Sequence, residues 1–96
     1  ITVIGTTLGR IIETCAIDHV DYLKIDCEGG EVAVFDGAHD IIFGKIRKIG
    51  MEYHRFVDDY YPGYHDRLIQ RLSGLYPNVL ERDNPGGQQS MVFAWR

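Results

Sequence analysis

An apolar run that ends abruptly in acidic residues and a glycine pair limits the possible folds of this chain more than any other feature. The segment Tyr22–Glu31 predicts a buried strand, a tight turn at its two glycines and the start of a helix. In an open α/β sheet, ligands bind outside the carboxyl ends of the strands. Asp26, Glu28 and Glu31 are therefore expected at the edge where such folds keep their chemistry.

Apolar periodicity predicts that helices and strands alternate around this segment. Thr6 or Thr7 is expected to cap a first helix, and residues 20–26 form an apolar run typical of a strand covered on both faces. A second strand is expected at residues 46–53. The apolar positions of the three helices are Leu8, Ile11, Ile12 and Cys15, then Val34, Phe35, Ala38, Ile41 and Ile42, then Leu68, Ile69, Leu72 and Leu75. Alternating elements of this kind imply right-handed parallel crossovers.

The end of the chain predicts an antiparallel hairpin. Residues 79–83 and 90–96 have strand patterns, and a short loop rich in turn-forming residues joins them. Met91, Phe93 and Trp95 alternate along the last strand, and we expect them in the core. The predicted fold class is α/β, with parallel strands and a C-terminal antiparallel β-hairpin at the edge of the sheet.

The overall composition excludes several classes of function. The 96 residues are 45% hydrophobic and 25% charged, which predicts one small domain of ordinary globular type. A net charge of -4 argues against a nucleic-acid partner, and the short basic cluster at Lys45, Arg47 and Lys48 is expected to be solvated. No apolar run is long enough for a membrane span, and no signal-peptide pattern opens the given sequence.

The two cysteines suggest a reducing cellular compartment and do not suggest a disulfide or metal site. Cys15 and Cys27 are too few for a disulfide framework and lack the spacing of a metal site. Both fall in mostly apolar elements, so we expect reduced thiols in the core. Reduced thiols suit a cytoplasmic protein, although a secreted one is also compatible with two cysteines.

Two acidic strand ends stand out together. One is the strand-turn-helix at Asp21–Glu31, which continues into Val34–Ala38, and the other is Ile49–His54. These two segments, in this order, resemble the motifs of the FkbM family of S-adenosylmethionine-dependent methyltransferases. The opening residues 1–8, with residues 11–13, also look like the family's helix entrance, although Gly9 replaces the usual acidic residue. The resemblance covers about the first half of the chain, and the second half matches only in the order of its elements.

The resemblance implies a Rossmann-like class I methyltransferase sheet. Residues 1–96 would form a single partial domain, the C-terminal half of that sheet, and the cofactor-binding half would lie upstream as its partner. The glycines of this chain form no G-x-G-x-x-G pattern, which agrees with that view. The implied reaction transfers a methyl group from S-adenosylmethionine to a hydroxyl on a small-molecule or sugar acceptor. The acceptor and the oligomeric state stay open.

Methyl transfer to oxygen requires an acceptor hydroxyl that is held in line with the methyl group and loses its proton. Asp26 and Glu28 follow one strand, and the ends of adjacent parallel strands lie about 4.8 Å apart. Glu52 and His54 end the next strand, and either would accept the proton, which contributes about 10²–10⁴-fold to the rate. We expect Asp26 to orient the acceptor or face the cofactor, and Glu28 to contact the cofactor.

An aromatic and acidic loop at residues 55–65 follows the second acidic strand. An acceptor-binding lid is expected at this place, because loops at strand ends carry function. Tyr60 and Tyr61 would line the acceptor pocket, and Glu31 would face the same substrate.

Other interpretations of these residues are open. The carboxylates and His54 would suit Mg²⁺ or Mn²⁺, but carboxylate clusters are common, and we favour a site without a metal. Glu28 and Glu31 would also fit a helix N-terminus, where a carboxylate gains about 0.3–1 kcal/mol from the dipole. His54 would fit a hydrogen-bonded structural role. The whole chain would fit an inactive, methyltransferase-like interaction module, or another Rossmann-like nucleotide enzyme.

Overall fold

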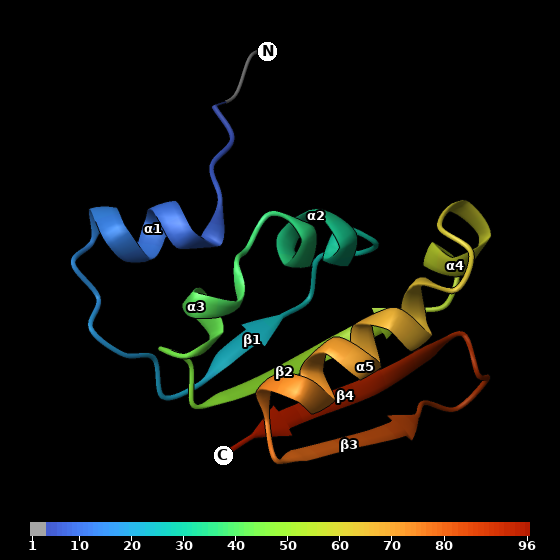
Figure 1. Ribbon diagram of the computed structural model, residues 1–96. Helices are drawn as coiled ribbons and strands as arrows, with labels where there is room; N and C mark the ends of the chain where they lie inside the picture. The colour runs from blue at the N-terminus through green and yellow to red at the C-terminus, as the bar shows by residue number, and fades with distance from the viewer. Residues whose placement is uncertain (1–3) are drawn as a thin grey trace.

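The computed structural model describes residues 4–96 and shows a mixed four-stranded sheet with helices packed on it (Figure 1). In chain order the elements are α1 (Leu8–Thr14), β1 (Leu23–Ile25), α2 (Glu31–Asp36), α3 (Asp40–Phe43), β2 (Lys48–His54), α4 (Val57–Tyr60), α5 (Tyr64–Leu75), β3 (Asn78–Asp83) and β4 (Gln89–Trp95). Residues 1–3, which begin the opening segment that the family resemblance uses, lie outside the described residues.

The order of strands across the sheet is β1-β2-β4-β3. β1 and β2 are parallel, as the crossover through α2 and α3 requires, while β4 is antiparallel to both β2 and β3. The predicted α/β class and the terminal hairpin are therefore confirmed. The last strand of the chain lies inside the sheet, because β4 pairs with β2 on one side and with β3 on the other.

The core lies on the face of the sheet that the helices cover. Ile49, Met51 and Tyr53 of β2 are fully buried, and their partners across the ladder in β4 are Ala94, Val92 and Ser90, which are also buried. Leu68 and Leu72 of α5 belong to the same apolar cluster, and α5 runs along β2 and β4 in Figure 1. The predicted faces of β2 and of the third helix are thus confirmed.

The predicted core position of Met91, Phe93 and Trp95 is wrong. These side chains are only half-buried, because their register with β2 sets them on the opposite face of the sheet from Val92 and Ala94. Alternation identifies the two faces of a strand but does not say which face the helices cover. On this second face, the ammonium of Lys48 lies over the rings of Phe93 and Trp95, at 5.6 and 6.0 Å from their centroids.

Two other predicted elements differ in extent. The expected second helix breaks at Gly37 into α2 and α3, which leaves Ile41 80% exposed. Arg71 of α5 donates hydrogen bonds to the carbonyls of Phe35 and Ala38 and so covers the end of α2. The run at residues 20–26 is a strand only over β1, and its Lys24 is exposed, so this strand is not covered on both faces.

The first helix is capped as expected, but the prediction for the cysteines is wrong. The hydroxyl of Thr7 accepts a hydrogen bond from the backbone N–H of Arg10 at 3.1 Å. Only Ile12 of α1 is buried, and Cys15 lies just after the helix in solvent. Cys27 follows β1 in the exposed turn. Within residues 4–96, no helix has the length and apolar character that crossing a membrane requires.

Candidate active site

The ends of β1 and β2 bring together three of the residues that the sequence singles out. Ile25 is paired with Met51, so Asp26 and Glu52 follow side by side at the end of this ladder. Asp26, Glu52 and His54 each offer a ligand atom, and these atoms lie within 4.8 Å of one another. Asp26 is exposed, Glu52 is half-buried and His54 is buried, so the cluster has one fixed member and two accessible ones. We call these three residues the strand-end cluster.

Glu31 holds the imidazole of His54 from behind. The distance between His54 Nδ1 and Glu31 Oε1 is 2.7 Å, and the two side chains are 3% and 0% exposed. Because a carboxylate oxygen accepts, Nδ1 carries the hydrogen of this bond. Nε2 of His54 has no hydrogen-bond partner in the described structure, and neither has Oε2 of Glu31. A buried nitrogen without a partner is uncommon, because it loses its hydrogen bonds to water on folding.

Acidic neighbours raise the pKa of His54 above its ordinary value of 6.5. Burial lowers this pKa, because it disfavours the charged ring. The hydrogen bond to Glu31 and the negative charges of Glu31, Glu28 and Glu52 outweigh the effect of burial. His54 is therefore a stronger base than a free histidine.

The turn after β1 sets Glu31 and His54 in contact. Glu28 and Gly29 both have positive φ values, 51° and 98°, which reverse the chain directly into α2. A Cβ atom at Gly29 would lie 2.7 Å from the ring of Phe56, so this position requires glycine. The same Phe56 ring lies 5.6 Å from the ring of His54. The glycine pair thus brings the aromatic ring and the start of α2 close to the histidine.

The remaining predicted site residues lie in different surroundings. Glu28, expected at the cofactor, is 82% exposed, and its Oε2 lies 3.8 Å from Nε2 of His54. Glu31, expected at the substrate, has no exposed surface and contacts His54 instead. Tyr60 and Tyr61 lie at the end of α4 and are 75% and 50% exposed. Among the described residues, no hydrogen bond or ring contact joins these tyrosines to the strand-end cluster, and their role stays a prediction.

A cavity of about 450 Å³ lies along the outer edge of β1. Its walls are mostly apolar and come from α1, β1 and α2, including Leu8, Ile25 and Val34. Asp26 belongs both to this cavity and to the strand-end cluster. Small-molecule sites are typically apolar hollows of this size with a few polar groups.

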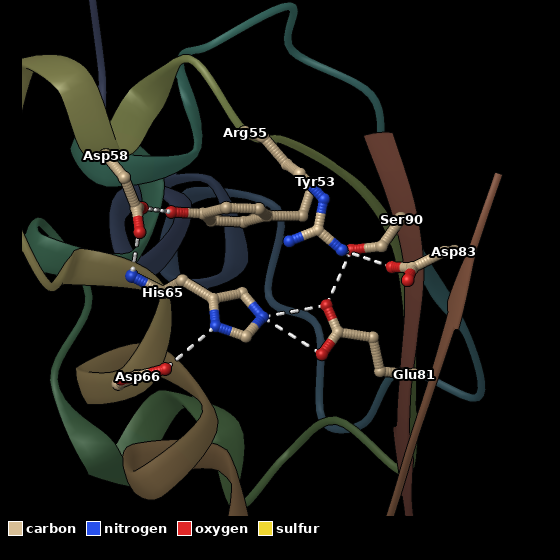
Figure 2. Close-up of polar contacts among 8 residues, drawn as sticks. All are labelled: Tyr53, Arg55, Asp58, His65, Asp66, Glu81, Asp83 and Ser90. Atoms are coloured by element: carbon tan, nitrogen blue, oxygen red, sulfur yellow. Dashed lines mark hydrogen bonds and ion pairs between the residues drawn. The ribbon is translucent and has the colours of Figure 1, made fainter. Parts of the chain in front are cut away.

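A second histidine is held in a polar network that the sequence did not indicate (Figure 2). Nε2 of His65 lies 2.9 and 2.7 Å from the two carboxylate oxygens of Glu81, and Nδ1 lies 3.1 Å from Asp66. Ser90 donates a further hydrogen bond to Glu81 at 2.6 Å. Burial lowers the pKa of His65, but the hydrogen bonds to Glu81 and Asp66 raise it more. We call His65, Asp66, Glu81 and Ser90 the helix-hairpin network, because it joins α5 to β3 and β4.

The pairing of Glu31 with His54 is also absent from the sequence-based prediction. The two residues are 23 positions apart, and their contact depends on the register of β1 with β2 and on the glycine turn. The usable signal was that both strand ends carry acidic residues and that the second also carries a histidine.

Comparison with known proteins agrees with this arrangement of acidic strand ends. The family described as Methyltransferase FkbM domain matches residues 1–82, which include the strand-end cluster and the turn that supports it. No curated protein and no solved structure matches the chain significantly. Since the match extends over most of the 96 residues, this chain belongs to the FkbM methyltransferase domain family.

Proposed function

We propose that the protein is an S-adenosylmethionine-dependent methyltransferase that methylates a hydroxyl group on a small-molecule or sugar acceptor. In this proposal the strand-end cluster forms the acceptor side of the active site. The observation that carries it is His54, whose buried Nε2 has no hydrogen-bond partner and whose ring has a nitrogen within 4.8 Å of carboxylate oxygens of Asp26 and Glu52. Membership of the methyltransferase family supports the reaction class.

For methyl transfer, the protein must place the acceptor hydroxyl next to the methyl group and remove the hydroxyl proton. S-adenosylmethionine, when bound, supplies an electrophilic methyl group. Nε2 of His54 carries the lone pair of the neutral ring when Nδ1 donates to Glu31, so in this proposal it accepts the hydroxyl proton. Glu31 then stabilises the positive ring that results, as the carboxylate of a catalytic triad does. Asp26 and Glu52 hold the acceptor hydroxyl in line with the methyl group.

The residues at the edge of β1 fit part of the cofactor. The cavity there is apolar, which suits an adenosine group, and the Asp26 carboxylate at its rim suits a positive sulfonium. Within residues 4–96, the outer edge of β1 pairs with no other strand. We infer that further parallel strands of a Rossmann-like class I sheet pair along this edge and supply the other wall. We also propose a cytoplasmic location for the full protein.

Binding and turnover in the full-length protein test this proposal. Calorimetry with S-adenosylmethionine is expected to show one site per chain, and transfer of a labelled methyl group is expected with an acceptor from a panel of hydroxylated compounds. His19→Ala is the matched control for substitutions of His54, because His19 is exposed and, among residues 4–96, its ion pair is with Asp21. Absence of S-adenosylmethionine binding by the full-length protein would refute the proposed function.

A further inference from the structure

We propose that Asp26, Glu52 and His54 form a binding site for one divalent transition-metal ion such as Mn²⁺. The proposal does not depend on methyl transfer, because it concerns the donor atoms that the two strand ends bring together. Their spacing, the preset histidine and the excess of negative charge each support it.

The spacing of the donors is close to what such an ion requires. Zinc holds nitrogen and oxygen donors at about 2.0–2.2 Å, so the donors of a tetrahedral site lie roughly 3.4 Å from one another. The three donor atoms of the strand-end cluster already lie within 4.8 Å of one another. The exposed side chain of Asp26 and the half-buried side chain of Glu52 can rotate to close this difference, while His54 stays in place.

His54 is prepared as a metal ligand before any ion binds. A ligating histidine usually donates its other ring N–H to a carboxylate, which fixes the tautomer and the direction of the free nitrogen. Glu31 fills this role at 2.7 Å from Nδ1. Nε2 is left buried without a partner, which is costly unless a ligand occupies that side of the ring.

The carboxylates around the cluster carry more negative charge than the nearby basic residues balance, and a bound cation would neutralise this excess. Glu28 and Glu31 add their negative charges to those of Asp26 and Glu52 around one imidazole. In the described part of the chain, the arginine ion pairs go to Asp83 and Asp40, and neither Asp26 nor Glu52 pairs with a lysine or arginine. Carboxylates that are close together and unpaired repel one another, and a bound divalent ion removes that repulsion.

The donor set indicates the kind of ion. Carboxylates alone suit Mg²⁺ or Ca²⁺, whereas imidazole suits transition metals. One imidazole with two carboxylates therefore favours Mn²⁺ or Zn²⁺ over Mg²⁺. Metal coordination and proton acceptance at Nε2 exclude each other, so a bound ion would activate the acceptor hydroxyl in place of His54.

Titration of the metal-free full-length protein with Mn²⁺, followed by electron paramagnetic resonance without cofactor or acceptor, tests the site. We expect one Mn²⁺ per chain and a signal from a directly coordinated nitrogen. Asp26→Asn and Glu52→Gln are expected to weaken binding more than about 10-fold, and Glu31→Gln about 10–100-fold. Asp59→Asn is the matched control, because Asp59 is an exposed carboxylate of α4 outside the cluster, and it should bind like the wild type.

Absence of saturable Mn²⁺ binding would overturn the proposal, and so would equal binding by Asp26→Asn, Glu52→Gln and the wild type. Both of these substitutions are at accessible positions, so a folding failure is not expected, and circular dichroism checks it. The result is separable from the proposed function, because cofactor binding is measured by calorimetry in a different sample. Mn²⁺ binding without S-adenosylmethionine binding would support the metal site and refute only the methyltransferase.

Discussion

Buried His54 and half-buried His65 have similar surroundings but differ in which ring nitrogens they leave without a hydrogen-bond partner. His54 and His65 each face a glutamate, Glu31 and Glu81 respectively, at 2.7 Å, and the pKa of each lies above 6.5. Both ring nitrogens of His65 have carboxylate partners, so its hydrogen bonds are complete. His54 keeps Nε2 without a partner. His65 therefore joins secondary-structure elements, whereas His54 is available to a ligand.

The sheet itself keeps the two environments apart. Tyr53 and His54 are consecutive in β2, and consecutive side chains of a strand point to opposite faces. Tyr53 lies on the core face, where its ring meets the ring of His65 edge-on at 5.1 Å. Its hydroxyl donates to Asp58, which also accepts the backbone N–H of His65. One strand therefore serves the helix-hairpin network and the strand-end cluster through adjacent residues.

The largest expected effect is on turnover and concerns His54 alone. In the metal-free protein, His54→Gln removes the proton acceptor, and methyl transfer should fall about 10²–10⁴-fold. His65→Gln, the matched substitution in the helix-hairpin network, should leave turnover within about threefold of the wild type, because His65 has no free nitrogen. Initial rates with labelled S-adenosylmethionine measure both. Equal losses in the two variants would mean that the comparison is wrong.

A smaller effect on turnover is expected from the residue behind His54. Glu31→Gln can keep a hydrogen bond to Nδ1 but loses the negative charge that raises the pKa of His54. Turnover should fall about 10-fold or more, by the precedent of residues that orient a functional histidine. Because His54 accepts a proton only when neutral, kcat/KM rises with pH through its pKa, and the midpoint should move to lower pH in this variant.

The pH profile of Glu81→Gln is the control for that shift. Glu81 contacts Nε2 of His65 as closely as Glu31 contacts Nδ1 of His54, so a general effect of losing a carboxylate beside a histidine would appear in both variants. We expect an unchanged midpoint in Glu81→Gln. A midpoint that does not move in Glu31→Gln would remove Glu31 from the positioning role.

Substitutions in the helix-hairpin network should lower the stability of the protein and leave its turnover nearly unchanged. Ser90→Ala removes the hydroxyl that donates to Glu81, and Ser90 is fully buried. The free energy of unfolding should fall by about 1 kcal/mol, the usual net value of such a bond. Glu81→Gln should cost about 1–3 kcal/mol, because His65 then loses a charged partner. Urea denaturation measures both values, and turnover should stay close to wild type.

Strand patterns and acidic strand ends made it predictable that the residues of the candidate site lie close together. The apolar runs before Asp26 and Glu52 predicted two neighbouring parallel strands, and parallel strands end at the same edge. The helix-hairpin network was not predictable, because the contact between His65 and Glu81 depends on how α5 crosses the hairpin. The face occupied by Trp95 was not predictable either, since it follows from the register of β4 with β2.

The hydrogen bond between Glu31 and His54, inside the candidate site, was not predictable from the sequence either. Glu31 begins α2, and a helix N-terminus explains an acidic residue there without any reference to a histidine. Only the tertiary structure shows that this carboxylate is fully buried and turned toward Nδ1. A local pattern predicts which residues reach an edge, whereas their pairing depends on turns and register.

The smallest expected effect is the pH dependence of stability, to which both histidines contribute with the same sign. Each has a folded-state pKa above the ordinary 6.5, so each binds its proton more tightly in the folded protein. Their contribution is complete below pH 6.5 and is lost as the pH rises through the two raised pKa values. The free energy of unfolding should therefore decline above pH 6.5 and then level off.

Urea denaturation at a series of pH values from below to well above pH 6.5 measures this decline. His65→Gln should remove the part that belongs to the helix-hairpin network and leave the part that belongs to His54. Saturating Mn²⁺ should remove the His54 part, because a ligating nitrogen binds no proton. A wild-type curve that stays flat above pH 6.5 would contradict the raised pKa values of both histidines. A decline that His65→Gln abolishes completely would assign the proton linkage to His65 alone, and His54 would then differ from His65 in pKa as well as in its free nitrogen.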